Sequence, residues 1–358
     1  MIESNPDYIA KWHGLHLRKP CAGCCKKRAL RPDNDPMNPP TFVQLHHEDR
    51  AAVRAELMSG LVAPAAHIAP KYLYDALGSR LFDVITELPE YYPTRTEAAI
   101  FRQHGQAMAQ ALPGSATLID LGAGGCGKGA ALFGLLGPSH YVAVDISVDF
   151  LQQALDGLQR QNPDMSMTGV GLDFSRGLDL PASVVPGNTP RILFYAGSSI
   201  GNFNPPEALD FLRTVQLACG TGPGSGLLIG VDLVKPVEEL EAAYDDALGV
   251  TAAFNRNMLL HLNRLIGSDF RLADWKHVAF FNTDASRIEM HLEAIRACTV
   301  QWSGGTREFA AGERIHTENS YKWTLDGFRT LLLQAGFGTA TAWTDDDLRF
   351  AVLWAPAR

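Results

Sequence analysis

A glycine-rich turn that follows an apolar segment constrains the fold of this chain more than any other feature. Residues 117–120 (Thr-Leu-Ile-Asp) are typical of a buried strand, and residues 122–127 (Gly-Ala-Gly-Gly-Cys-Gly) follow almost at once. A helical pattern that includes residues 130–133 comes next. Glycines at such a place let the backbone turn tightly and approach a ligand closely. The segment therefore predicts a strand–turn–helix unit with a ligand site at the turn.

The same alternation of strands and helices continues along the chain. Further apolar segments typical of buried strands lie at residues 140–145, 191–195 and 226–231. A helical pattern covers residues 150–158, and residues 339–343 and 350–354 flank an acidic turn that predicts a terminal hairpin. We therefore predict an α/β fold, in which helices cover both faces of a parallel sheet.

The glycine turn also matches most of the P-loop pattern of nucleotide-binding proteins. Gly122, Gly127 and Lys128 have the required spacing, but the next residue is Gly129. A P-loop needs Ser or Thr at that place, because its hydroxyl binds magnesium. We therefore exclude a P-loop nucleotidase.

The same glycines match the pattern of dinucleotide-binding folds, so acidic residues must decide the ligand. Asp120 and Asp145 each end a predicted strand, and Asp173, in residues 171–174 (Gly-Leu-Asp-Phe), fits the end of a third. A carboxylate would repel a pyrophosphate, whereas three acids suit a nucleoside that carries a sulfonium charge. These features are typical of the class I (Rossmann-like) methyltransferase fold, which binds S-adenosylmethionine.

The composition restricts the partners. A net charge of −8 over 358 residues argues against nucleic acid, because phosphate binding requires a strongly basic face. No apolar run has the length of a bilayer span, and the first residues lack a signal-peptide pattern. Six cysteines, most of them far apart, are typical of reduced thiols. We expect a cytoplasmic monomer with no nucleic-acid or membrane partner.

The first forty or so residues differ from the rest. They are rich first in Lys and Arg and then in Pro, Asn and Asp, so we predict a disordered basic extension over residues 1–43. Residues 13–16 (His-x-x-His) and 21–25 (Cys-x-x-Cys-Cys) supply enough ligands for one zinc ion, but their spacing matches no common zinc site. We therefore predict no metal site.

Several longer motifs lie outside the glycine turn. They are residues 74–83 (Tyr-Asp-x3-Ser-x-Leu-Phe-Asp), 88–95 (Leu-Pro-Glu-Tyr-Tyr-Pro-Thr-Arg), 197–202 (Gly-Ser-Ser-Ile-Gly-Asn), 244–246 (Tyr-Asp-Asp), 250–257 (Val-Thr-Ala-Ala-Phe-Asn-Arg-Asn) and 317–320 (Thr-Glu-Asn-Ser). Together they resemble the L-histidine Nα-methyltransferases of the ergothioneine pathway. The likeness runs from about residue 44 to the C-terminus.

This resemblance implies two domains with the substrate between them. The S-adenosylmethionine-binding, Rossmann-like domain would comprise residues 96–231 and 322–358. A second, discontinuous α+β domain of residues 44–95 and 232–321 would bind the substrate.

The resemblance also implies a set of site residues. Cofactor-contacting positions fall on Gly122, Lys128, Asp145, Asp173 and Phe174. Histidine-contacting positions fall on Tyr91, Asn202, Tyr244, Glu318 and Ser320, and Met290 lines the same site. Tyr74 also lines it and is our candidate for the catalytic residue that helps the amine proton to depart.

The chemistry of these residue types agrees with histidine as the substrate. The Asn202 amide and the Tyr244 hydroxyl can donate to the α-carboxylate. Glu318 can accept an imidazole N–H while Ser320 bonds the other ring nitrogen. A substrate without that N–H would leave a buried carboxylate unpaired. The resemblance implies trimethylation of the α-amino group of L-histidine to hercynine.

Two alternatives stay open. The first is an Nα-methyltransferase of tryptophan or another aromatic amino acid. Glu318 and Met290 disfavour it, because an indole needs a wider and less acidic pocket. The second is a protein that binds the cofactor without turnover, which the intact set of substrate residues disfavours.

Overall fold

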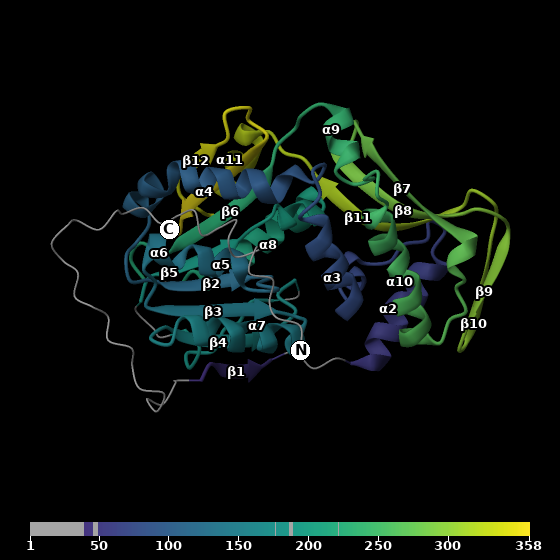
Figure 1. The fold of residues 1–358 in the computed structure, drawn as a ribbon, viewed down its shortest axis with the longest axis horizontal. Helices are drawn as coiled ribbons and strands as arrows, with labels where there is room; N and C mark the ends of the chain where they lie inside the picture. The colour runs from purple at the N-terminus through teal and green to yellow at the C-terminus, as the bar shows by residue number, and fades with distance from the viewer. Residues whose placement is uncertain (1–38, 46–48, 176, 186–188, 221) are drawn as a thin grey trace.

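The computed structural model of the chain describes residues 39–45, 49–175, 177–185, 189–220 and 222–358. These residues form two lobes that lie side by side (Figure 1). The expected extension up to residue 38, including its histidine and cysteine segments, lies outside the described residues.

Eight strands of the described chain form one large sheet, in the order β1-β4-β3-β2-β5-β6-β13-β12. They are β1 (Thr41–Gln44), β2 (Thr117–Leu121), β3 (His140–Asp145), β4 (Ser166–Gly171), β5 (Arg191–Tyr195), β6 (Gly226–Asp232), β12 (Thr341–Thr344) and β13 (Phe350–Pro356). Neighbours from β1 to β6 are parallel, whereas β13 runs antiparallel to β6 and to β12. The predicted parallel α/β sheet with a terminal hairpin is confirmed.

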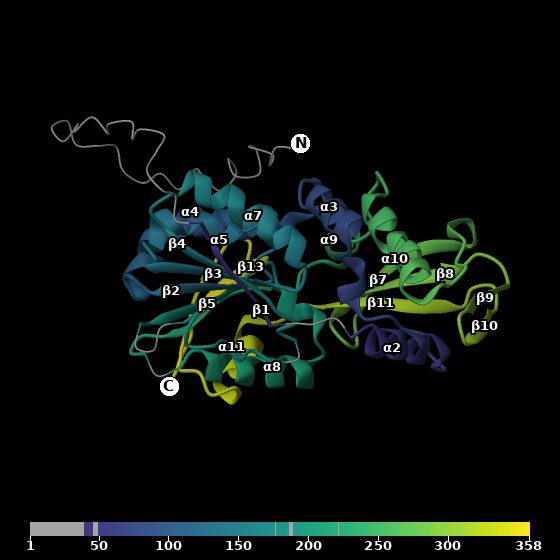
Figure 2. The same ribbon diagram turned by 90° about the horizontal axis from the view of Figure 1, so that it is seen from below.

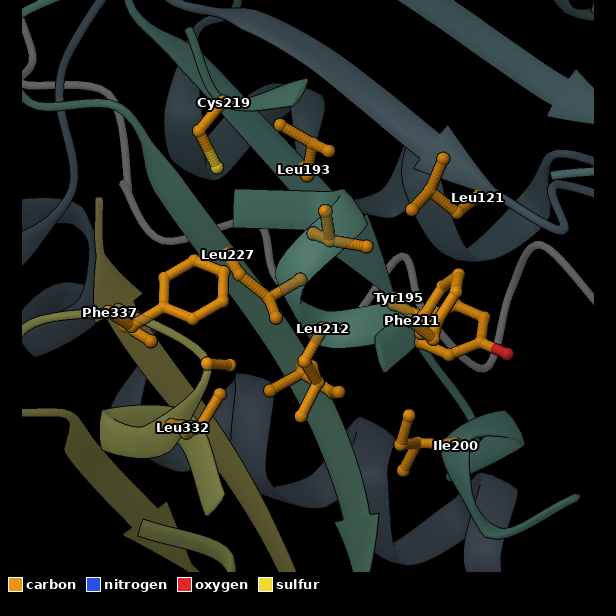
Figure 3. Packing of buried hydrophobic residues seen from close by; sticks show 14 of the residues in the cluster. Leu121, Leu193, Tyr195, Ile200, Phe211, Leu212, Cys219, Leu227, Leu332 and Phe337 are labelled. Atoms are coloured by element: carbon orange, nitrogen blue, oxygen red, sulfur yellow. The ribbon is translucent and has the colours of Figure 1, made fainter. Parts of the chain in front are cut away.

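Helices cover both faces of this sheet (Figure 2). One face carries α4 (Tyr92–Ala111), α5 (Gly127–Ala131), α6 (Phe133–Leu136) and α7 (Val148–Gln161), and the other carries α8 (Pro205–Ala218) and α11 (Leu325–Gln334). Successive strand residues pack on opposite faces, since Leu118 belongs to the core under α4 and α7 and Ile119 to the core under α8 and α11. Figure 3 shows the second core, in which Leu212 of α8 lies among Leu193 and Leu227.

The order of strands reverses between β2 and β5. From β2 the chain continues to β3 and β4 on one side, and from β5 it continues to β6 on the other. Ligands of open α/β sheets bind at the carboxyl ends of the strands at such a point. The loops that follow β2 and β5 line one cavity there.

The second lobe combines a small sheet with helices. Its antiparallel strands are β7 (Trp275–Asn282), β8 (Arg287–Ala294) and β11 (Arg314–Tyr321), and a separate hairpin is formed by β9 (Cys298–Trp302) and β10 (Gly305–Phe309). Its helices are α2 (Arg50–Val62), η1 (Pro70–Leu73), α3 (Ala76–Ile85), α9 (Val237–Ala242), α10 (Val250–Ile266) and η3 (Leu272–Asp274). Leu61, Phe254 and Trp275 belong to its buried core. In the described parts of both lobes, no helix is apolar over the length that a bilayer requires.

The structure differs from the expected division of the chain at two places. Residues 41–43 are not part of a disordered extension, because they pair with β4 as strand β1, and Phe42 packs over Gly169. The end of the extension was predicted from composition and was wrong, because the run Thr-Phe-Val at residues 41–43 is itself typical of a strand. The expected boundary after residue 95 falls inside α4, whose first turn packs in the core of the second lobe while Ile100 packs in the first.

We predict that Gly169→Ala destabilises the protein through this contact. A Cβ atom at Gly169 would lie 2.5 Å from the Phe42 ring and 2.7 Å from Leu155 Cδ1, so β1 or α7 must shift. Overpacking of this kind costs about 1–3 kcal/mol of unfolding free energy, measurable by urea denaturation. Gly134→Ala is the control, because nothing lies within 4 Å of its Cβ position. Equal stability of the two variants would contradict the packing of β1 on the sheet.

Candidate active site

A cavity of about 740 Å³ lies at the carboxyl ends of the parallel strands, and a smaller one adjoins it. The large cavity is lined by all five residues expected to contact the cofactor: Gly122, Lys128, Asp145, Asp173 and Phe174. The small one is lined by the other seven expected site residues: Tyr74, Tyr91, Asn202, Tyr244, Met290, Glu318 and Ser320. Tyr74, Tyr91 and Asn202 line both, so the two cavities form one continuous site.

The glycine turn shapes the large cavity through backbone geometry. Gly122 has φ +72° and Gly124 has φ +49°, in the left-handed region that side chains disfavour. The N–H of Gly124 donates to Asp145 Oδ2 at 2.9 Å and that of Ser147 to Oδ1 at 2.8 Å. These bonds fix the Asp145 carboxylate beside the turn, where its remaining lone pairs can accept the hydroxyls of a ribose. The Phe174 ring lies 3.6 Å from the place of a Gly122 Cβ, so ring and turn lie side by side in the cavity lining.

Gly129 shows why this turn is not a P-loop. A Cβ atom there would lie 2.4 Å from Asp120 Oδ2 and 2.8 Å from the Tyr141 hydroxyl oxygen, so the Ser or Thr of a P-loop has no room. The Tyr141 hydroxyl donates to Asp120 at 2.8 Å. Burial raises the pKa of Asp120 to about 7, although this hydrogen bond acts in the opposite direction.

Lys128 connects the glycine turn with two other elements. Its ammonium pairs with Glu97 Oε2 at 2.8 Å, and the Glu97 side chain is fully buried. Glu97 Oε1 accepts the N–H of Gly197, in the loop after β5, at 2.8 Å. Lys128 therefore lines the cavity with a charge that Glu97 balances.

The charges of the large cavity fit a cationic nucleoside. Six acidic residues but only two lysines line it, and both lysines pair with glutamates, Lys71 with Glu56 and Lys128 with Glu97. A pyrophosphate would meet repulsion here, whereas a sulfonium would be stabilised. The residues present therefore fit a cationic nucleoside such as S-adenosylmethionine.

A β-bulge in β11 directs two predicted residues into the small cavity. His316 pairs with His291 of β8 and Glu318 pairs with Met290, so Thr317 is an extra residue between them. A bulge reverses the alternation of side chains along a strand. Glu318 and Ser320 consequently share the inward face after the bulge, and both are buried.

Glu318 carries an unpaired acceptor. The side chain is 7% exposed, and its Oε2 atom has no hydrogen-bond partner among the described residues. Burial raises the pKa of Glu318 to about 7, although the nearby Lys322 acts in the opposite direction. A buried carboxylate oxygen without a partner is costly, so this atom is free to accept a hydrogen bond from a ligand in the cavity.

The Tyr244 hydroxyl has a different partner from the expected one. It donates to Ser320 Oγ at 2.7 Å, so in this arrangement its proton is not available for a substrate carboxylate. Lys322 donates to both hydroxyls, at 3.0 Å to Tyr244 and at 2.8 Å to Ser320. Its charge pairs with Asp232 Oδ2 at 2.8 Å.

Lys322 and Asp232 were not among the predicted site residues. A signal for Lys322 was present, because it continues the period of two set by Glu318 and Ser320 along one strand face. Asp232 follows the apolar run of residues 226–231, and nothing in that segment indicates its ion pair with Lys322, which lies in a distant part of the chain.

Aromatic rings form the wall between the two cavities. Tyr74 packs edge-on against Phe254 at 5.5 Å and against Phe82 at 5.6 Å, and Phe82 packs against Tyr91 at 6.1 Å between centroids. Burial raises the pKa of Tyr74 well above its ordinary value, and the Glu318 charge adds to this. The Tyr74 hydroxyl therefore stays protonated. It can act only as a relay, which accepts one proton while it releases its own.

We predict that Asp145→Ala weakens the binding of S-adenosylmethionine by about 10- to 100-fold, because hydrogen bonds to a charged group are lost. Isothermal titration calorimetry measures the dissociation constant. Asp156→Ala is the matched control, since Asp156 is an exposed residue of α7 outside the cavity lining. Unchanged affinity of the Asp145 variant would remove this residue from the cofactor site.

Known proteins are similar in sequence to this chain over most of its length. A family model described as "Histidine-specific methyltransferase, SAM-dependent" matches residues 53–357. Histidine N-alpha-methyltransferase of Mycolicibacterium smegmatis is 40% identical over 300 residues, covering 82% of this chain and 91% of that protein. The protein of the same name from Mycobacterium tuberculosis is 37% identical over 301 residues, covering 82% and 92%. Ergothioneine biosynthesis protein 1 of Neurospora crassa is 29% identical, covering 76% of this chain and 31% of that protein. The chain thus belongs to the family of SAM-dependent, histidine-specific methyltransferases.

Proposed function

We propose that this enzyme is an L-histidine Nα-methyltransferase, which trimethylates the α-amino group to hercynine and so contributes to ergothioneine biosynthesis. The observation that carries the proposal is the buried, unpaired Oε2 atom of Glu318 in the cavity that adjoins the glycine turn. The proposal assigns cofactor binding to residues 96–231 and 322–358 and substrate binding to residues 44–95 and 232–321. We also propose that the enzyme acts as a monomer in the cytoplasm, as expected from the sequence.

The imidazole ring is assigned to the β11 end of the site. Glu318 accepts a ring N–H, and Ser320, two residues along the same strand face, bonds the other ring nitrogen. Met290, which pairs opposite Glu318 on β8, limits the space beside the ring. An indole offers one N–H and a larger ring, so tryptophan fits these contacts less well.

The amino-acid backbone of the substrate is assigned to the junction of the two cavities. Asn202, the last residue of η2 (Ser199–Asn202), lines both cavities, and its amide can bind the α-carboxylate without a buried cation. S-adenosylmethionine supplies the activated methyl group when bound. Asn202 and Glu318 hold histidine at both ends, which positions the amine toward the large cavity. The Tyr74 hydroxyl lies on the wall between the cavities, where it can take part in removing the amine proton.

The proposal is tested with the full chain, S-adenosylmethionine and a panel of free amino acids, read by mass shift. We expect the product to be about 42 mass units heavier than histidine, because three methyl groups each replace one hydrogen. We also expect histidine to outcompete tryptophan in a mixture. Methylation of tryptophan in preference to histidine would establish the alternative function. Absence of methyl transfer to every amino acid would overturn the proposal.

We predict that kcat/KM for histidine falls as the pH drops through about 7. Because burial raises the pKa of Glu318 to about 7, its carboxylate is ionised above that pH and protonated below it. Only the ionised form accepts the ring N–H with full strength. Glu318→Gln should lower kcat/KM at pH 8.5 by about 10- to 100-fold and remove this ionisation from the profile.

The imidazole of free histidine also titrates, at about pH 6.5. This ionisation remains in the kcat/KM profile of Glu318→Gln, so it can be told apart from that of Glu318. The affinity of the variant for S-adenosylmethionine serves as the control and should be unchanged, because Glu318 does not line the large cavity. Superimposable profiles of the two proteins would refute the assignment of Glu318.

A further inference from the structure

We propose that Lys322 is a positioning residue that fixes the direction of the hydrogen bonds at the imidazole end of the site. Ser320 must then present a hydrogen-bond donor to the ring, and the site selects a ring that has both an N–H and an unprotonated nitrogen. The inference rests on the proposed function, because it concerns the ring of that same substrate.

The first observation is that the Lys322 ammonium has three acceptors for its three hydrogens. It lies 2.8 Å from Asp232 Oδ2, 3.0 Å from the Tyr244 hydroxyl oxygen and 2.8 Å from Ser320 Oγ. Its side chain is fully buried, and an ammonium can only donate. The direction of the bonds to Tyr244 and Ser320 is therefore fixed by chemistry.

The second observation is that the Lys322 ammonium keeps its positive charge. Asp232 is 1% exposed and also accepts from Lys235 at 2.6 Å and from the Tyr92 hydroxyl at 2.7 Å. Burial alone would lower the pKa of Lys322, but Asp232 and the hydrogen bonds raise it above its ordinary value. Lys322 thus stays a cation and a donor at neutral pH.

The consequence for Ser320 follows from counting its lone pairs. Ser320 Oγ accepts from Lys322 at 2.8 Å and from the Tyr244 hydroxyl at 2.7 Å. A hydroxyl has two lone pairs and one proton, so both acceptor positions are occupied. The Ser320 proton is the only part left for a ligand, and Ser320 lines the small cavity.

Glu318 and Ser320 therefore present opposite hydrogen-bonding groups to one ring. The Glu318 Oε2 atom accepts, and the Ser320 hydroxyl donates. Neutral imidazole has one N–H and one bare nitrogen, and it satisfies both. Imidazolium, pyrrole and indole rings lack the bare nitrogen and would leave the Ser320 proton without an acceptor, which is costly in a buried place.

The experiment compares histidine with two analogues, 3-(pyrrol-2-yl)alanine and 3-(pyrrol-3-yl)alanine. Each keeps one ring N–H and replaces the other nitrogen by C–H. Dissociation constants are measured by calorimetry in the presence of S-adenosylhomocysteine. We expect the unsubstituted enzyme to bind histidine about 10- to 100-fold more tightly than the better analogue. In Lys322→Met this ratio should fall about tenfold, because the Ser320 hydroxyl can then turn toward Tyr244.

Lys235→Met is the matched control. Lys235 is another buried lysine on the same Asp232 carboxylate, but it donates to Tyr92, Asp232 and the Leu233 carbonyl, not to Tyr244 or Ser320. Its loss should affect stability and leave the histidine-to-pyrrole ratio unchanged. Lys322→Met leaves Asp232 paired with Lys235, so the buried carboxylate keeps a counter-ion. If Lys322→Met does not fold, Lys322→Gln replaces it, because the amide keeps a polar group in the buried place and offers an acceptor to which Ser320 can turn.

The outcomes separate this inference from the proposed function. A fall of the ratio in Lys322→Met, or in Lys322→Gln, and not in Lys235→Met supports the inference. An unchanged ratio, or an equal fall in Lys235→Met, overturns it even if histidine is methylated normally. If the unsubstituted enzyme neither binds nor methylates histidine, the proposed function itself fails.

Discussion

The buried ion pair between Asp232 and Lys322 joins the two lobes at the point where the site lies. Asp232 ends β6 of the large sheet, and Lys322 follows β11 of the small one. The Trp323 N–H donates to the Asp232 carbonyl at 3.1 Å, so the backbones meet there as well. Burial of two charges is costly, and here further hydrogen bonds from Tyr92 and Lys235 offset it. Loss of Asp232 would leave both Lys322 and Lys235 without their carboxylate partner, at a cost of about 3–5 kcal/mol.

The two cavities at this junction are lined by different polar groups. The large one is lined by acids and by glycines that expose backbone, which suits a cationic nucleoside. The small one has a single buried carboxylate and a set of hydroxyls ordered by Lys322. The bulge in β11 links them, because it turns Glu318 and Ser320 inward next to the loop that follows β5. Gly201 of that loop fits closely, since a Cβ atom there would lie 2.9 Å from the Tyr321 carbonyl oxygen.

Much of the fold follows from local patterns in the sequence. The strands at 140–145 and 191–195 have the predicted bounds, because apolar runs that end in turn residues fix them. The expected site residues all line the two cavities, although their roles are still predictions. Contacts between distant segments were harder to predict. The pairing of β1 depends on a strand more than a hundred residues away, and the ion pair of Lys322 depends on Asp232 in a different sheet. The bulge at Thr317 depends on a register shift that no short window contains.

The arrangement of polar and aromatic groups also suits a substrate whose amine changes during repeated methylation. In the proposed binding mode, the directional bonds of Glu318 and Ser320 lie at the ring end of the substrate, which does not change. The wall formed by Tyr74, Phe82 and Tyr91 is aromatic. A trimethylated amine donates no hydrogen bond but keeps a positive charge, which aromatic faces attract. A site that gripped the amine by its N–H groups would weaken with each methyl added, whereas recognition through the ring stays constant over all three transfers.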